Sequence, residues 1–229
     1  MKAIWGVIIG MACVFGDVSA QVCPENVKAI QEKREGDFFR CEGVSDAVFA
    51  RIQGKSFKDD CTTPRDDLRY LRVLHYNKVG EVLEGELVCH KSIADDLLSI
   101  FHELYKARYP IERMVLIDEY DADDEASMRA NNSSAFNFRF ISGTRRLSRH
   151  AQGMAIDINP LYNPYIRQRN GRTLVSPSGA EAYTDRTKDF PYKIVKGDLC
   201  YRLFKKYGFT WGGDWKNSKD YQHFEKKWK

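Results

Sequence analysis

The 229-residue sequence has little that would place it in a specialised class of protein. After residue 16 no apolar run is long enough to span a membrane, no two cysteines form a Cys-x-x-Cys pair, and no segment is repeated. The acidic run at residues 118–127 lacks the spacing and the glycine of an EF-hand calcium loop. These absences argue against a membrane-embedded domain, a cysteine-ligated zinc site, a repeat protein and an EF-hand.

The composition is that of an ordinary globular protein. Hydrophobic residues make up 43% of the chain and charged residues 30%, and the formal net charge is +4. Basic and acidic residues are interleaved and no nucleic-acid-binding motif is present, so we predict a solvated surface and no nucleic-acid partner. The length suits one large domain or two small ones. The sequence leaves the oligomeric state open.

The first twenty residues have the three parts of a secretory signal peptide. Lys2 gives a positive start, residues 3–16 are apolar, and Val18-Ser19-Ala20 offers the small residues that precede a cleavage site. A membrane anchor is the alternative, but the apolar run is short for a span. We therefore predict that residues 1–20 are a signal peptide. The protein would be exported, periplasmic or extracellular, with no stable membrane span after cleavage.

Five cysteines would remain after cleavage, and this odd number leaves at least one thiol unpaired in a monomer. Exported proteins can form disulfides, and three of the five lie close to the new N-terminus. A disulfide in that region is therefore plausible, although the sequence does not define the pairing. The five are Cys23, Cys41, Cys61, Cys89 and Cys200.

The chain divides into an N-terminal segment at residues 21–62 and a main domain at residues 63–229. The main domain mixes helices and mostly antiparallel strands without a regular βαβ alternation. This predicts an α+β fold, a small mostly antiparallel sheet with flanking helices. Helices are predicted from Ser45 to Gly54, from a Ser92 cap to Pro110, and at 121–130 and 198–208. Strands are predicted at 68–77, 85–91, 112–118, within 131–146, and at 153–159, 209–213 and 221–225, with a long loop at 160–197.

The stretch SRHAQGMAIDINP, residues 148–160, places an acid inside an apolar run. If GMAIDIN is a strand, Asp157 faces the side opposite its apolar neighbours. An unpaired buried carboxylate is costly, so Asp157 needs a partner. His150 lies seven residues earlier, and Gly153 permits a tight turn between them. Both side chains can therefore converge on a metal ion, which would neutralise the acid.

A catalytic zinc site requires a third protein ligand, and His223 is the best candidate. His75 and His90 lie in the predicted hairpin and His102 lies within a helix, so we interpret these three as structural or exposed. Asp220 precedes His223 by three residues, and a regular strand would point it away. From the turn before that strand, Asp220 can approach the metal and accept a proton from water, the role of a general base.

These two patterns resemble those of the M15 zinc peptidases, the D-alanyl-D-alanine carboxypeptidase and L-alanyl-D-glutamate endopeptidase group. SRHAQGMAID fits the motif SxHxxGxAxD, and DYQHFE fits a second motif, an acid followed by two residues and a histidine. AFNFRFISGTRRLSRH also resembles the stretch upstream of the first motif. Two motifs in the right order are more specific than either alone. The resemblance covers about residues 66–228.

The resemblance implies a zinc ion bound by His150, Asp157 and His223. It implies that Asp220 is the base that activates water, and that Ser148 orients the site rather than attacking the substrate.

The resemblance also implies an arginine that polarises the scissile carbonyl. Arg139 is the first candidate for this role, and Arg145 and Arg146 are close competitors. Independently of the resemblance, WGGDW at residues 211–215 is interpreted as a tight turn with packed tryptophans rather than a ligand site, with Trp211 or Trp215 as candidates to line the cleft.

An exported zinc metallopeptidase that hydrolyses the stem peptides of peptidoglycan is the function that the resemblance implies. Asp220 stands where some carboxypeptidases of the group have glutamate, which favours an L-alanyl-D-glutamate endopeptidase. A D-alanyl-D-alanine carboxypeptidase is the first alternative. The second is a non-catalytic zinc-containing cell-wall binding module, against which the intact acid at Asp220 argues.

Overall fold

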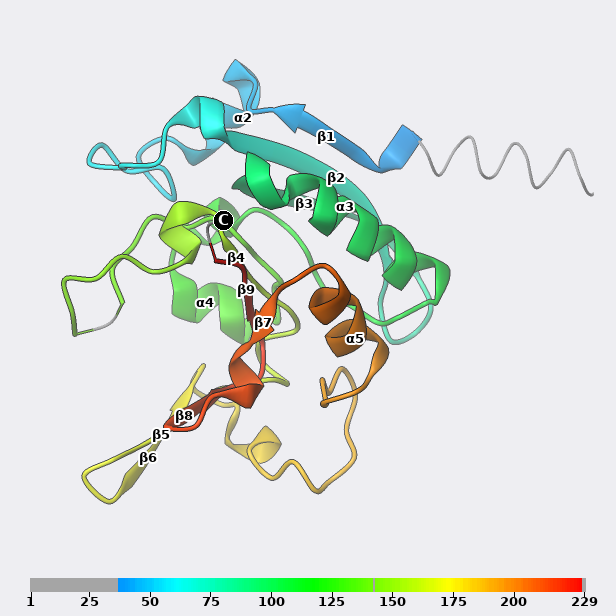
Figure 1. Cartoon of the computed structure of the whole chain (residues 1–229), viewed down its shortest axis with the longest axis vertical. Coiled ribbons are helices and arrows are strands. Elements are labelled where there is room, and N and C mark those ends of the chain that lie inside the picture. Colours follow the sequence, from blue (N-terminus) through cyan, green and yellow to red (C-terminus); the bar gives the residue numbers. More distant parts are fainter. Residues whose placement is uncertain (1–36, 142, 228–229) are drawn as a thin grey trace, which may run out of the picture. The chain divides into compact units, whose positions relative to one another are not determined.

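The structure is a computed structural model that describes residues 37–141 and 143–227. The chain divides into Met1–Arg34 and a compact unit, Glu35–Lys229. The predicted signal peptide and Cys23 lie outside the described residues. The described part combines four α-helices with three small antiparallel sheets, which confirms the predicted α+β fold (Figure 1). No helix in this part is both long and apolar enough to cross a membrane.

The first sheet, in the order β1-β2-β3, is built on the predicted hairpin. β2 (Leu68–Tyr76) and β3 (Val82–His90) pair antiparallel along their whole length, so the turn lies where the sequence predicted it. Gly80 has a φ of +84° in this turn, a conformation that glycine adopts at no steric cost. β1 (Arg40–Gly43) pairs with the other edge of β2.

The long helix α3 (Lys91–Lys106) packs against this sheet (Figure 1). Its apolar residues recur at intervals of three and four and therefore form one stripe. The stripe is part of the larger hydrophobic core, together with the inner faces of β2, β3 and β4. The buried residues of the stripe are Ile93, Ala94, Leu97, Ile100, Phe101 and Leu104.

The predicted cap of this helix was wrong. α3 begins at Lys91, and its N-cap is His90, whose Nδ1 accepts a hydrogen bond from the Ser92 amide at 3.1 Å. Strand β3 runs directly into the helix, so the residue that ends the strand also caps the helix.

The other predicted helices are confirmed. Ser45 caps α2 (Asp46–Ile52) and Asp198 caps α5 (Leu199–Lys206), each by accepting a hydrogen bond from a backbone amide of the first turn. The acidic helix is α4 (Asp124–Arg129). Short 3-10 helices are η1 (Arg65–Asp67), η2 (Ile117–Tyr120), η3 (His150–Gln152), η4 (Glu181–Tyr183) and η5 (Gly212–Asp214).

Two further sheets lie beyond the first. The second has the order β4-β9-β7, with strands at Ala155–Asp157, His223–Glu225 and Thr210–Trp211. The third has the order β6-β5-β8, with strands at Arg172–Ser176, Tyr165–Arg169 and Ser218–Asp220. The three strands of the second sheet confirm the predictions for these regions, although each is shorter than predicted.

The prediction of a loop without strands at residues 160–197 was wrong. β5 and β6 form a hairpin there, and its turn is Asn170-Gly171, with φ values of +50° and +72°. A two-residue hairpin turn of this kind requires positive φ at both central positions, which asparagine and glycine tolerate best.

The strands predicted at 112–118 and within 131–146 do not form. In the first of these segments, the backbone of Val115 pairs instead with an amide side chain. Asn132 Oδ1 accepts from the Val115 amide at 2.8 Å, while its Nδ2 donates to the Val115 carbonyl and to Ser127 Oγ, both at 3.0 Å. One buried side chain thereby satisfies both backbone groups of Val115.

We therefore expect Asn132→Ala to lower the free energy of unfolding by about 2–4 kcal/mol, because it removes three hydrogen bonds and leaves buried backbone groups unpaired. Urea unfolding followed by circular dichroism measures the change. Asn217→Ala is the control: it changes an exposed asparagine and should stay within about 0.5 kcal/mol of wild type. An equal effect of both variants would contradict the role given to Asn132.

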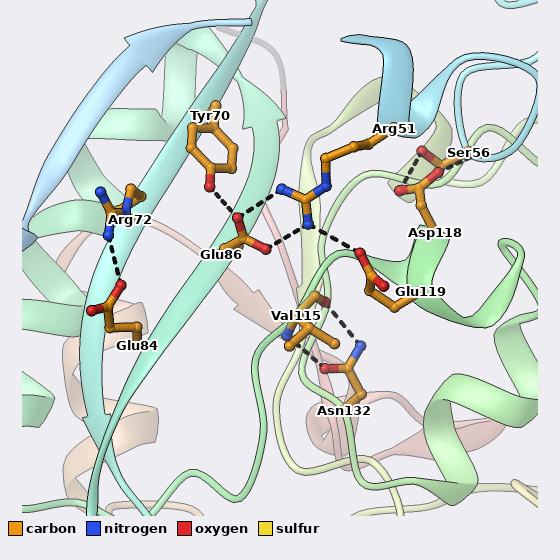
Figure 2. A network of polar contacts seen from close by, with 10 residues as sticks. All are labelled: Arg51, Ser56, Tyr70, Arg72, Glu84, Glu86, Val115, Asp118, Glu119 and Asn132. Atoms are coloured by element: carbon orange, nitrogen blue, oxygen red, sulfur yellow. Dashed lines mark hydrogen bonds and ion pairs between the residues drawn. The ribbon is translucent and has the colours of Figure 1, made fainter. Parts of the chain in front are cut away.

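Residues 37–62 contact the rest of this unit through a polar network (Figure 2). Arg51 of α2 donates two hydrogen bonds to the Glu86 carboxylate of β3, at 2.8 and 2.7 Å, and the Tyr70 hydroxyl donates to the same carboxylate. Ser56 donates to the Asp118 carboxylate from its amide and its hydroxyl, at 2.9 and 3.0 Å. The described N-terminal residues are thus held against the first sheet and η2, while the domain boundary at residue 62 stays a prediction.

The four cysteines of the described residues, Cys41, Cys61, Cys89 and Cys200, are free thiols. No disulfide therefore joins any two of these four, and a disulfide that involves Cys23 stays a prediction.

Candidate metal centre

Three buried side chains from two paired strands and a 3-10 helix meet at one point. β4 and β9 pair so that Asp157 lies directly opposite His223. His150 begins η3, and Gly153 then turns the chain into β4 with a φ of +65°. A Cβ on Gly153 would lie 2.6 Å from the His90 amide nitrogen, so only glycine fits this turn. The structure thus brings together the three residues that the sequence proposed as ligands.

The donor atoms have the separations that a small metal ion requires. His150 Nε2 lies 3.3 Å from Asp157 Oδ2, and His223 Nδ1 lies 3.0 Å from Asp157 Oδ1. The two imidazole nitrogens are 3.2 Å apart. A tetrahedral ion with bonds of about 2.0–2.1 Å holds its donors about 3.3 Å apart. The His150, Asp157 and His223 group can therefore hold a metal ion.

A hydrogen bond on the far side of each imidazole ring orients the donor atoms. His150 Nδ1 lies 2.7 Å from the Ala135 carbonyl oxygen, which can only accept, so we assign the ring proton to Nδ1. His223 Nε2 lies 3.2 Å from Glu225 Oε2, so we assign its proton to Nε2. In the neutral form that binds a metal, the remaining nitrogens, His150 Nε2 and His223 Nδ1, then direct lone pairs towards Asp157. Such outer partners are typical of histidines that bind metals.

The electrostatics of the group favour bound positive charge. Burial by itself raises the pKa of Asp157, but His150 and His223 outweigh it and hold the pKa of this carboxyl below its usual range. Burial lowers the pKa of His223, yet its hydrogen bonds to Asp157 and Glu225 raise that pKa to about 10. A site that retains a proton so strongly without a metal is also one that a divalent cation can occupy in place of the proton.

Asp220 lies at the end of β8, in the third sheet, and not in an irregular turn as the sequence suggested. Burial is the main cause of a raised pKa for its carboxyl; with the positive charge of His223 opposing it and the negative charge of Asp157 adding to it, the pKa is about 7. Its Oδ1 is buried and has no hydrogen-bond partner among the described residues. A buried carboxyl with an unused oxygen and a pKa near neutrality is suited to accept and release a proton.

Gly212 makes room for Asp220. A Cβ on Gly212 would lie 2.5 Å from the Asp220 carbonyl oxygen and 2.6 Å from its Cβ. WGGDW was interpreted as a tight turn whose tryptophans pack or line the cleft, so this role of Gly212 was missed. Two consecutive glycines shortly before an acid-x-x-His motif were the available signal for a close backbone contact.

We expect Gly212→Ala to keep the metal but to reduce kcat about 10- to 100-fold, because displacement of a catalytic group by about 1 Å costs this much. Metal analysis and steady-state kinetics on the same sample test this. Gly43→Ala is the matched control, because a Cβ there has nothing within 4 Å. Wild-type kcat in Gly212→Ala would show that the position of Asp220 does not depend on Gly212.

The His150, Asp157 and His223 group lies in a cleft of about 940 Å³. Asp220 and Glu225 also line it, and so does Trp215, whose ring centroid is 5.4 Å from that of His223. Trp211, the alternative that the sequence left open, is not among the lining residues. Arginines are unusually frequent in the lining: Arg139, Arg146, Arg149, Arg167 and Arg169.

Arg139 is one of these cleft residues, and its guanidinium forms an ion pair with Asp124 at 2.8 Å. Its Nε is buried and has no hydrogen-bond partner in the described part of the chain. Arg146 also lines the cleft, whereas Arg145 does not. Of the three arginines considered for polarising the scissile carbonyl, Arg139 and Arg146 therefore remain candidates.

All three metal-site residues and Asp220 lie in a segment that can be compared with known families. Residues 142–226 match the M15 peptidase family model described as D-alanyl-D-alanine carboxypeptidase. The match confirms the resemblance to the M15 peptidases in this segment, which is well under half of the chain. It begins later than the resemblance inferred from the motifs, which extended back to about residue 66. Neither the curated proteins nor the solved structures contain a match to the chain.

Proposed function

We propose that the protein is an exported zinc peptidase that hydrolyses the stem peptides of bacterial peptidoglycan. The observation that carries this proposal is the buried His150, Asp157 and His223 group, which opens into a cleft that Asp220 also lines, with one carboxyl oxygen left unpaired among the described residues. The M15 match over residues 142–226 supports a peptide substrate. The signal-peptide pattern at residues 1–20 supports export to the periplasm or beyond.

Zinc is the metal that we propose, because two imidazoles and one carboxylate form a common catalytic zinc ligand set. Bound there, zinc would polarise the scissile carbonyl and lower the pKa of water to about 7. The chain itself would supply two catalytic groups. Asp220 would accept a proton from the attacking water and return it to the leaving amine.

We propose Arg139 as the cation that stabilises the negative charge on the carbonyl oxygen. Its ion pair with Asp124 holds the guanidinium at the cleft wall, and its buried Nε still has an unused hydrogen. Loss of a donor of this kind reduces kcat by about 100- to 1000-fold. Arg146 is the competitor, but it makes no ion pair with any described residue that would fix its position.

Cleavage between L-alanine and D-glutamate is the activity that we favour. A carboxypeptidase binds the free terminal carboxylate close to the scissile bond, whereas an endopeptidase needs a groove that continues past it. The cleft continues from the metal group along the β5–β6 hairpin, with Arg167 and Arg169 in its lining. This extension supports the endopeptidase over the D-alanyl-D-alanine carboxypeptidase.

Two synthetic stem peptides test the proposal: a pentapeptide that ends in D-alanyl-D-alanine, and a tripeptide. We expect the zinc-loaded protein to cut both after the first alanine, with products identified by mass spectrometry. Release of D-alanine from the pentapeptide alone would identify a carboxypeptidase. If neither peptide is cut but zinc is retained, the alternative of a non-catalytic zinc-containing binding module would be correct.

A further inference from the structure

The strand register of the third sheet places Asp220 on the same face as two arginines. Tyr165 of β5 lies opposite Asp220 of β8. Side chains directly opposite each other in a sheet share a face, and alternate residues along a strand return to it. Arg167 and Arg169 follow Tyr165 at two and four residues, so they lie on the face that carries Asp220. All four residues line the cleft.

Arg167 and Arg169 lie along β5 on a line that leads away from Asp220. A strand rises by about 3.3 Å per residue, which places Arg167 about 7 Å and Arg169 about 13 Å past the row that holds Asp220. β8 pairs with β5 only from Tyr165 to Arg167, so the end of the hairpin extends past β8 (Figure 1). An extended peptide with its scissile bond at Asp220 would pass Arg167 after about two residues and Arg169 after about four.

Arg167 and Arg169 are available for a ligand. Both are exposed, and neither forms an ion pair or a side-chain hydrogen bond with another described residue. Two other arginines of the cleft are engaged within the chain: Arg139 pairs with Asp124, and Arg149 donates to Gln152 at 2.9 Å. Arg146 is not engaged in this way, but it lies outside the β5–β6 hairpin.

An apolar surface accompanies these cations. Leu174 of β6 lies opposite Arg167, on the same face of the hairpin, and is 45% exposed. Ile141 is 41% exposed and lines the same cleft. This part of the cleft therefore combines positive charge with aliphatic side chains.

We propose that this face of the β5–β6 hairpin is a binding arm for an extended anionic peptide. Arg167 and Arg169 bind carboxylates that lie several residues away from the scissile bond, and Leu174 covers an aliphatic part of the same peptide. The complementarity of charge identifies the occupant, since carboxylates pair with guanidinium groups in bidentate geometry. The proposal rests on the proposed function only for the position of the reacting bond.

Direct binding tests this arm separately from catalysis. The probes are two fluorescently labelled stem peptides of the same sequence, one with free carboxylates and one with these groups amidated. Binding to the zinc-free protein is followed by fluorescence anisotropy, so no hydrolysis interferes. Arg167→Gln/Arg169→Gln should weaken binding of the carboxylate peptide at least about tenfold and bring its Kd to that of the amidated peptide.

Lys58→Gln/Lys205→Gln is the matched control, because it removes two positive charges from exposed positions outside the cleft. We expect this control to bind both peptides as wild type does. Equal weakening of both peptides by the arginine double variant, or no weakening, would overturn the proposal. So would a wild-type protein that binds both peptides equally. Hydrolysis of the unlabelled peptides by zinc-loaded wild type is scored separately, so failure of the peptidase function remains distinguishable from failure of the arm.

Discussion

His223→Ala should purify with almost no zinc, whereas wild type should carry close to one zinc per chain. The substitution removes Nδ1, one of three donors that lie 3.0–3.3 Å apart, and leaves only His150 and Asp157. Two protein ligands do not form a stable zinc site, so both the metal content and the peptidase activity should be lost. Metal analysis by inductively coupled plasma mass spectrometry after dialysis gives the stoichiometry.

His102→Ala is the control, because it removes a histidine of α3 that does not line the cleft. It should keep its zinc. Added zinc should raise the melting temperature of wild type and of this control, since a ligand that binds only the folded state stabilises it. The same addition should leave His223→Ala unchanged. Full zinc retention by His223→Ala would refute the assignment of this ligand set.

The site could be predicted from the sequence because its parts are local. His150 and Asp157 are seven residues apart across one glycine, and the acid-x-x-His pattern placed Asp220 near His223. These two parts of the site meet because β4 pairs with β9, and the sequence did not specify this pairing. The two outer partners were missed for different reasons: the Ala135 carbonyl carries no sequence signal, whereas Glu225 was visible on the same strand face as His223.

The errors in the predicted fold have physical causes. Residues 112–118 have the composition of a strand, but the Asn132 side chain takes both backbone groups of Val115, and only isolated backbone pairs form on either side of it. The hairpin at Tyr165–Arg169 and Arg172–Ser176 was read as loop because residues 160–197 are rich in proline, glycine, tyrosine and arginine. Its Asn-Gly turn was nevertheless a strong hairpin signal, and with it the binding arm could have been predicted. By contrast, no simple sequence pattern shows that a side chain, such as that of Asn132, will take the backbone hydrogen bonds of another segment.

Asp220→Asn should keep both the fold and the zinc but lose about 100- to 10,000-fold in kcat, the usual effect of removing a general base. Asparagine has the size and shape of aspartate, so it fits the space beside Gly212 and changes only the ability to take up a proton. Zinc content and kcat are measured on the same preparation. A kcat near that of wild type would transfer the role of base to another carboxylate, of which Glu225 is the nearest candidate.

The stability of the zinc-free variant separates a catalytic from a structural role. Burial raises the pKa of Asp220 from 3.8 to about 7, so the folded protein keeps a proton that the unfolded chain releases. The ionised group therefore destabilises the fold, increasingly as pH rises from about 4 to about 7, and fully above that range. Asparagine carries no such charge, so zinc-free Asp220→Asn should melt at the same or a higher temperature than zinc-free wild type at pH 8. If Asp220 were mainly structural, the variant would melt earlier, and its lost activity would follow from a damaged fold rather than from a missing base.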